Sequence, residues 1–211
     1  MPTASISAYP GVTIEQQDTV WSGRFAVDIV RFRHRRFNGA VSAVRTWELL
    51  RRGRAAALLP YDPWTDQVVL IEQFRLPALA AGLNPVMMEV PAGLCDEGED
   101  AETTGRREAH EEMGLGPDLV VPMLDVVLTV GGADERCTMF VGRVHAPPAG
   151  PDGIAGQAGL ASELEDIRVH VLDAGIAIEN AAEGRYPNSV TSLALLWLGA
   201  RRERLRASWS A

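Results

Sequence analysis

The chain has 211 residues, of which 46% are apolar and 23% charged, and its formal net charge is −8. That length and composition fit one or two domains with a hydrophobic core. All 20 basic residues are arginine, which excludes chemistry that needs a lysine amine, such as a Schiff base, a pyridoxal phosphate anchor or a phosphate-loop lysine. An anion must then be bound by guanidinium groups, backbone amides or metal ions.

The first part of the chain is expected to form a small antiparallel β unit. Strands are predicted over residues 12–20 and 25–34, and the Asn38-Gly39 pair is the strongest short hairpin signal. The returning strand covers about residues 40–51. Because three short strands bury too little apolar surface to be stable alone, we expect residues 1–54 to pack on the rest or on a second subunit. Residues 55–211 then form the main domain.

The remaining elements follow in chain order. Two apolar strands are predicted at AAALLP and VVLIEQFR, then a loop over 76–88 and a short strand, MMEVPAG, that ends at its proline and glycine. A helix over 100–113 ends at Gly114. We then expect strands at 118–130 and 137–145, a long mobile loop at 146–162, a strand at DIRVHVL, and helices at 173–183 and 189–207. Asn188 or Ser189 is expected to cap the last helix.

Targeting and disulfide signals are absent from the printed sequence. The opening residues have neither the basic nor the apolar stretch of a signal peptide, and no apolar run reaches the roughly 18 residues of a membrane helix. Cys95 and Cys137 are too few for a disulfide scaffold and lack the spacing of a zinc site. We therefore expect a cytoplasmic protein with reduced thiols and no membrane contact.

Charge is distributed in two opposite blocks. Residues 21–54 hold nine arginines against Asp28 and Glu48, a balance of +7, whereas residues 89–112 hold nine acids against Arg106 and Arg107, a balance of −7. The basic block interleaves aromatic residues in RFRHRRF, which suggests nucleic acid, but the negative net charge and the alternation of an ordinary strand argue against it. A nucleotide is the better hypothesis: an adenine would stack on Trp47 or under Arg24, the alternative for Trp47 being core or interface packing.

The acidic block carries the chemistry. On the predicted helix Glu108, Glu111 and Glu112 share one face, where like charges repel unless a cation lies between them. Oxygen ligands favour magnesium, with manganese as the alternative; a solvated acidic face is the other interpretation. Arg107 is placed to pair with Glu99 and so brace the preceding loop against the helix.

This stretch resembles the Nudix box. Seven fixed positions are filled by Gly93, Glu99, Arg107, Glu108, Glu111, Glu112 and Gly114, and the two apolar ones by Ala109 and Leu115. A chance match is on the order of 10⁻⁶ at average residue usage. The resemblance implies a magnesium-dependent hydrolase of substituted nucleoside diphosphates. It also implies the α+β fold class: a Nudix α/β/α sandwich with a mixed sheet, here with an N-terminal antiparallel β extension.

The chain is also similar to the bacterial ADP-ribose pyrophosphatases over nearly its whole length. The matching stretches are RFRHRRFNG, VVLIEQFR, EVPAG, GGADER, SELEDIRVHV and LALLWL. The resemblance implies hydrolysis of ADP-ribose to AMP and ribose 5-phosphate by a homodimer that exchanges its N-terminal sheets. One departure weakens the substrate assignment: Val130 stands where that subfamily carries proline.

The resemblance also assigns roles to individual residues. Two to three magnesium ions are implied, with metal ligands at Glu108, Glu112, Glu165 and the carbonyl of Ala92. Catalytic roles fall to Glu163 as general base on the mobile loop, to Glu111 in support of the ligands, and to Arg107. Substrate contacts fall to Arg75 at phosphate, to Gly131 and Gly132 near the distal ribose, and to Glu135, in addition to Arg24 and Trp47.

Three alternatives stay open. The first is a different substrate, another nucleoside diphosphate sugar such as GDP-mannose. The second is a non-catalytic Nudix-fold sensor, which would not need all four box glutamates. The third is RNA binding or decapping, which would favour an excess of basic residues.

Overall fold

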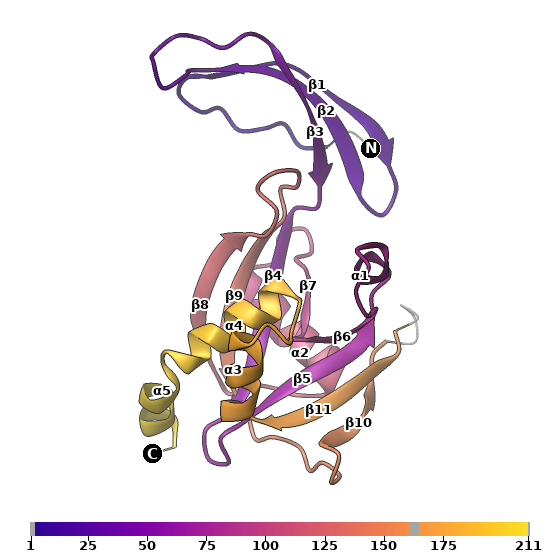
Figure 1. Ribbon diagram of the computed structural model, residues 1–211, viewed down its shortest axis with the longest axis vertical. Coiled ribbons are helices and arrows are strands. Elements are labelled where there is room, and N and C mark those ends of the chain that lie inside the picture. The colour runs from indigo at the N-terminus through magenta and orange to yellow at the C-terminus, as the bar shows by residue number, and fades with distance from the viewer. Residues whose placement is uncertain (1–2, 161–164, 211) are drawn as a thin grey trace. The chain divides into compact units, whose positions relative to one another are not determined.

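The computed structural model describes residues 3–160 and 165–210 (Figure 1). The chain separates into two compact units, one made of Met1–Gly53 with Val127–Arg136 and the other of Arg54–Val126 with Cys137–Ala211. None of the helices in the described part of the chain is both long and apolar enough to cross a membrane.

The N-terminal unit is a three-stranded antiparallel sheet in the order β1-β2-β3. Its strands are β1 (Val12–Ser22), β2 (Ala26–His34) and β3 (Arg45–Arg51). At its centre Asp28 is fully buried and accepts hydrogen bonds from Thr3, Thr19 and Gln17 and from Arg51 Nη1. Burial alone would raise the pKa of Asp28, but these donors lower it overall. The sheet therefore holds one charged group that four partners satisfy.

The loop 127–136 belongs to this same unit. The backbone N–H of Leu50 donates to the Gly132 carbonyl at 2.8 Å, and the N–H of Asp134 donates back to the Leu50 carbonyl at 3.1 Å. Arg51 and Arg52 then form ion pairs with Asp134 and Glu135, at 2.7 and 3.0 Å. The loop is thus attached to the end of β3 by both backbone and side chains.

The second unit is built on an eight-stranded sheet in the order β10-β11-β5-β4-β9-β8, with β6 paired to β5 and β7 to β4. The strands are β4 (Arg54–Asp62), β5 (Gln67–Phe74), β6 (Val86–Glu89), β7 (Ala92–Leu94), β8 (Leu119–Val127), β9 (Arg136–Arg143), β10 (Ile154–Ala158) and β11 (Ile167–Asp173). The helices are α1 (Leu76–Ala80), α2 (Ala101–Met113), α3 (Ala174–Ala182), α4 (Ser189–Gly199) and α5 (Arg202–Trp209).

Helices cover both faces of this sheet. Along β4 successive side chains point to opposite faces, yet residues 55–62 are all buried, so each face must be covered. On one face Ala56 and Leu58 pack with Ala101 and Ala109 of α2. In Figure 1, α3 and α4 lie in front of the sheet and α2 behind it. The expected helix–sheet–helix sandwich with an antiparallel N-terminal extension is confirmed.

The structure differs from the sequence prediction in three predicted segments. The predicted loop 76–88 contains α1 and most of β6, and the predicted loop 146–162 contains β10. The predicted helix 189–207 is two helices, α4 and α5, separated at Ala200 and Arg201. In β10 the sequence IAGQA has no apolar alternation, so its strand conformation depends on pairing with β11 rather than on local pattern.

Candidate active site

The stretch from Gly93 to Leu115 folds as a strand, a loop and a helix. Helix α2 begins after Asp100, whose side chain accepts hydrogen bonds from the backbone N–H groups of Glu102 and Thr103. It ends at Gly114, where φ is 71°, a left-handed conformation that glycine adopts without strain. Cap and stop signals in the sequence therefore fix the length of the helix that carries the acidic residues.

Two of the predicted carboxylates, on Glu108 and Glu112, turn towards β7. Glu112 is only 2% exposed, and its Oε2 accepts a hydrogen bond from the Ala92 N–H at 3.1 Å. Glu108 lies directly against Gly93, where even a Cβ atom would overlap its carboxylate. A glycine at position 93 is thus a steric requirement of the inward orientation of Glu108.

Burial makes these two carboxylates hard to ionise. Burial, together with the charges of Glu108 and Glu165, raises the pKa of Glu112 to about 8. Burial likewise raises the pKa of Glu108. A divalent cation would lower both pKa values again, because its positive charge stabilises the ionised form of each carboxylate.

Arg107 connects the loop to the helix. Its Nε and Nη2 contact the Glu99 carboxylate at 3.2 Å, so the predicted pairing is confirmed. Its Nη1 reaches Glu108 at 2.7 Å and Glu111 at 2.9 Å. The hydrogen bonds that Glu99 accepts, first from Arg107 and then from Thr104 and the Asp96 backbone N–H, lower its pKa to about 2. Glu111 therefore differs from Glu112, because it is held by a cation that the protein itself provides.

The donor set fits a hard divalent cation in charge and chemistry. Within residues 3–160 and 165–210, no three His, Cys, Asp or Glu side chains gather in the manner of a finished metal cluster. What favours a cation is the buried Glu112 carboxylate and the half-buried Glu108 carboxylate, both with raised pKa values, next to the Ala92 backbone. Glu165 is close enough for its charge to raise both values, and its own Oε2 accepts from the Leu160 N–H at 3.0 Å. Glu163 lies outside the described residues.

Arg75 follows β5 and is held by Glu89 at the end of β6. Its Nε lies 3.1 Å from each Glu89 carboxylate oxygen and its Nη2 lies 2.8 Å from Oε2. The charges of Glu112 and Glu165 act on the guanidinium, which puts Arg75 beside the acidic cluster. Sequence reasoning missed Glu89; the signal available was a lone acid between the apolar Met88 and Val90.

The other predicted substrate contacts all belong to the N-terminal unit, whereas the box belongs to the second unit. Trp47 Nε1 donates to the Gly131 carbonyl at 3.3 Å, and the Gly132 carbonyl accepts from Leu50. Glu135 is paired with Arg52, and the Arg24 guanidinium lies 5.9 Å from the Phe25 ring centroid. Trp47 and the two glycines are therefore brought together, with Trp47 supporting the loop by a hydrogen bond.

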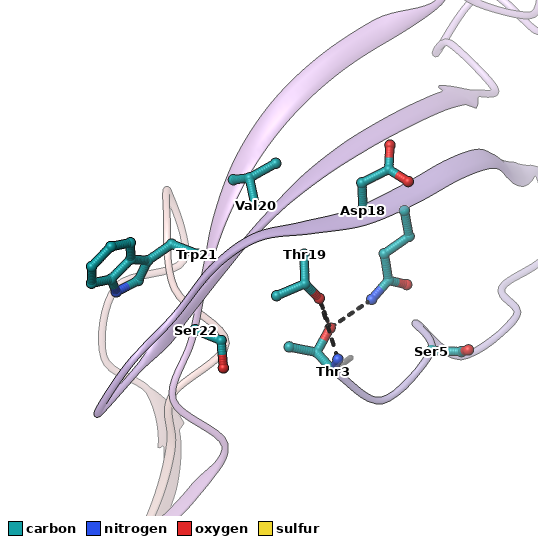
Figure 2. Close-up of a pocket in the computed structure, with 8 residues that line it drawn as sticks. Thr3, Ser5, Asp18, Thr19, Val20, Trp21 and Ser22 are labelled. Atoms are coloured by element: carbon teal, nitrogen blue, oxygen red, sulfur yellow. Dashed lines mark hydrogen bonds between the residues drawn. The ribbon is translucent and has the colours of Figure 1, made fainter. Parts of the chain in front are cut away.

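A cavity of about 680 Å³ lies in the N-terminal unit and contains none of the predicted site residues (Figure 2). Hydroxyl and amide groups dominate its lining, which consists of Thr3, Ser5, Gln17, Asp18, Thr19, Val20, Trp21 and Ser22. Several of these groups already bond one another or the buried Asp28. This cavity therefore borders the hydrogen-bond network around Asp28.

Comparison with known proteins identifies the family. The model of the NUDIX domain matches residues 51–187. The chain is 42% identical over 199 residues to an ADP-ribose pyrophosphatase of Escherichia coli K12, covering 94% of this chain and 93% of that protein. It is 35% identical over 201 residues to an ADP-ribose pyrophosphatase of Haemophilus influenzae, covering 94% and 90%. A GDP-mannose pyrophosphatase of Yersinia pestis is 33% identical over 150 residues, covering 70% and 72%.

A solved structure supports the fold. The crystal structure of an ADP compounds hydrolase superposes with a TM-score of 0.64 over 96% of this chain and 98% of that one, at 20% identity. The intact box, the inward-facing glutamates on α2 and these matches agree. The chain belongs to the Nudix hydrolase family.

Proposed function

We propose that this Nudix hydrolase cleaves the diphosphate of ADP-ribose, giving AMP and ribose 5-phosphate. The observation that carries the proposal is the 42% identity to an ADP-ribose pyrophosphatase over 94% of the chain. An alignment of 199 residues must extend into the N-terminal sheet, beyond the family match at 51–187. The similarity therefore includes the part of the chain that lies outside the box-bearing domain.

A different nucleoside diphosphate sugar is the second candidate substrate. The match to the GDP-mannose pyrophosphatase of Yersinia pestis covers only 70% of the chain, which favours ADP-ribose, whereas Val130 in place of proline favours a different substrate. A sensor without catalysis is less well supported, because Glu108, Glu111 and Glu112 are all retained.

The metal-binding residues in this proposal are Glu108, Glu112, Glu165 and the Ala92 carbonyl, holding two to three magnesium ions or manganese in their place. Bound there, the ions would neutralise the diphosphate, polarise phosphorus and lower the pKa of an attacking water. The buried state of Glu112 and the glycine that admits Glu108 support this assignment.

The remaining residues divide the work of orientation and proton transfer. Arg75 donates to the diphosphate oxygens, and Glu163 takes the proton of the water that attacks phosphorus. Arg107 keeps the loop and helix in register through Glu99, with Glu111 as its second anchor. Because a diphosphate adds negative charge to an acidic site, Arg75 is well suited to offset part of it.

The other end of the substrate is assigned to the N-terminal unit. Gly131, Gly132 and Glu135 lie in the loop proposed to contact the distal ribose, and Arg24 and Trp47 are proposed to contact adenine. The hydrogen bond from Trp47 to Gly131 supports a joint role for that pair.

The assembly proposed is a homodimer in which residues 1–54 serve as the dimerisation element and residues 55–211 as the hydrolase domain. Large apolar side chains exposed in the N-terminal unit support this, among them Tyr9, Trp21 and Phe37. A cytoplasmic location is proposed because Cys95 and Cys137 are thiols and not a disulfide. Nucleic acid is not among the proposed partners, given the net charge of −8.

A panel of ADP-ribose, GDP-mannose and other sugar nucleotides, incubated with magnesium, tests the function. We expect ADP-ribose to have the highest kcat/KM, with AMP as a product. Glu112→Gln should abolish turnover, and Glu163→Gln should lower kcat by about 10² or more, the usual effect of losing a general base. The matched control is Glu102→Gln on the outer face of α2, where Glu102 pairs with Arg106. Wild-type protein that binds but turns over none of the panel would leave the sensor alternative in front.

A further inference from the structure

The Arg75–Glu89 ion pair is arranged by the pairing of β5 with β6. Glu89 lies opposite Ile71 in this antiparallel ladder, and the N–H of Arg75 donates to the Pro85 carbonyl at 2.7 Å, one residue beyond the strand. Ile71, Gln73 and Arg75 therefore project to one face of the sheet. Ile71 packs in one cluster with Met113 of α2, so α2 covers this face of the sheet. Glu112 also belongs to α2.

Glu89 occupies one edge of the Arg75 guanidinium. Its carboxylate takes the Nε and Nη2 edge, while Gln73 Nε2 donates to Glu89 Oε2 at 3.4 Å. The Glu89 residue is 7% exposed, whereas the Arg75 side chain is 40% exposed. A buried carboxylate thus orients this cation, and within residues 3–160 and 165–210 its Nη1 donates no hydrogen bond, so that nitrogen can meet another anion.

The acidic cluster is a competing partner for this cation. An arginine side chain is long and flexible, and near Glu112 and Glu165 an unrestrained guanidinium would pair with their carboxylates. Such a pair would leave the Arg75 guanidinium unable to bind the diphosphate. It would also leave the Glu112 and Glu165 carboxylates unable to bind the metal ions. Arg107 shows that an arginine beside this cluster does pair with its members, Glu108 and Glu111.

We propose that Glu89 is a positioning residue that fixes the Arg75 guanidinium towards the diphosphate and keeps it away from the metal-binding carboxylates. The inference rests on the proposed function, because it assigns Arg75 to the substrate diphosphate. Glu89 itself contacts neither substrate nor metal; it acts through Arg75.

The first test is the Glu89→Gln variant in steady-state kinetics. The amide keeps the size of the side chain but removes the charge, and its NH₂ group cannot accept from Arg75. We expect KM for ADP-ribose to rise about 10-fold, the factor that one lost charge-assisted hydrogen bond implies, with kcat changed less than about threefold. Glu72→Gln is the matched control. Glu72 follows Ile71 on the same strand, so its side chain points to the face of the sheet opposite to Arg75, where it pairs with Arg168. It should leave KM unchanged.

The second test separates positioning from a purely structural role. If Glu89 acts through Arg75, the double variant Glu89→Gln/Arg75→Gln should have the same KM as Arg75→Gln alone, because the two changes remove one shared interaction. Additive effects on KM would overturn the proposal. Glu89→Asp keeps the charge and should recover part of the lost affinity, and thermal unfolding of each variant checks its folding.

Metal binding supplies a readout without turnover. Free Mn²⁺, followed by electron paramagnetic resonance, should reveal a several-fold weaker affinity in Glu89→Gln, and the double variant should recover it because no guanidinium is left to compete. Equal affinity in wild type and Glu89→Gln would refute the part of the proposal that concerns the carboxylates.

The two proposals fail in different ways. A wild type that hydrolyses no sugar nucleotide refutes the proposed function, and the same variants are then compared by calorimetric titration with magnesium pyrophosphate. Weaker pyrophosphate binding by Glu89→Gln would still support the positioning role. Wild-type activity with an unchanged KM in Glu89→Gln refutes the positioning role alone.

Discussion

The charge of Glu112 should depend on whether a divalent cation is bound beside it, because its pKa is strongly raised. Its pKa is raised to about 8 from 4.5 by burial first and then by the charge of Glu108. Between those two values the side chain is protonated in the folded protein and ionised in the unfolded chain, so the metal-free protein loses stability as pH rises from about 4.5 to about 8. A divalent cation binds the ionised form and should reverse that loss.

We therefore predict that magnesium raises Tm much more at about pH 9 than at about pH 5. Thermal unfolding with EDTA and with magnesium, at both pH values, measures the difference. Glu112→Gln should remove most of the pH dependence of the magnesium effect, while Glu102→Gln should keep it. An equal magnesium shift at the two pH values would rule out Glu112 as the linked group.

Residue roles were only partly predictable from the sequence. The spacing of Glu108, Glu111 and Glu112 correctly predicts a shared helix face, because helical periodicity alone sets it. It does not separate the buried Glu112 from the arginine-bound Glu111, since that difference depends on the contacts of β7 and Arg107. Glu89 could not be assigned at all, because its partner Arg75 is identified only by the register of β5 and β6.

Among the elements, α5 is joined both to β9, where Arg143 Nη1 donates to the Trp209 carbonyl, and to the turn between β4 and β5. Asp66, in the turn between β4 and β5, is buried and has φ of 61°. Its carboxylate accepts from Arg202 and from the Tyr61 hydroxyl, and it pairs with Arg206. The hydrogen bond from Arg202 is the main cause that lowers the pKa of Asp66.

We predict that Asp66→Asn destabilises the protein by about 2 kcal/mol at neutral pH, because two arginines lose their shared charged acceptor. Asparagine tolerates the positive φ, so the change isolates the charge. The contribution of Asp66 is present above its unfolded pKa of 3.8 and is lost as pH falls through its lower folded value. In denaturant unfolding, the unfolding free energies of wild type and variant should therefore become equal as pH falls below about 4. Glu183→Gln, at an exposed pair with Arg185, should have an effect under about 0.5 kcal/mol.

Element predictions succeeded where local pattern and tertiary structure agree. The α2 helix has a cap at Asp100 and a stop at Gly114, and β4 and β5 are long apolar runs. The predictions failed at β10, whose sequence IAGQA has no apolar alternation and so gives no strand signal, and at the break between α4 and α5. At that break Arg202 turns to the Asp66 carboxylate, a partner 136 residues away that no local rule could indicate.

At the scale of the whole molecule, the linear charge map overstated the basic block. Three arginines of residues 21–54 pair with acids that lie outside it: Arg33 with Glu15, Arg51 with Asp134 and Arg52 with Glu135. The last two acids come from the loop 127–136, which joins the N-terminal unit although it is some 80 residues away in sequence. Three of the seven excess positive charges are therefore neutralised inside the unit, which weakens any argument for nucleic acid.

The apolar surface of the N-terminal unit leads to the last prediction. Phe37, beside the Asn38-Gly39 turn, is fully exposed, and Trp21 and Val41 are each 66% exposed. Exposed apolar groups of this size within one small unit are typical of an interface, so we predict a homodimer with Phe37 buried against the partner. Light scattering coupled to size exclusion should give twice the chain mass, and Tm should rise with protein concentration.

Phe37→Ser should shift the mass towards that of one chain and remove the concentration dependence of Tm, because dissociation then no longer accompanies unfolding. Ile176→Ser is the matched control: Ile176 is 58% exposed on α3, in the second unit, and its replacement should leave the dimer intact. A wild type with the mass of one chain at every concentration would contradict the homodimer. A dimer unaffected by Phe37→Ser would place the interface elsewhere and leave the exposure of that side chain to be explained by another contact.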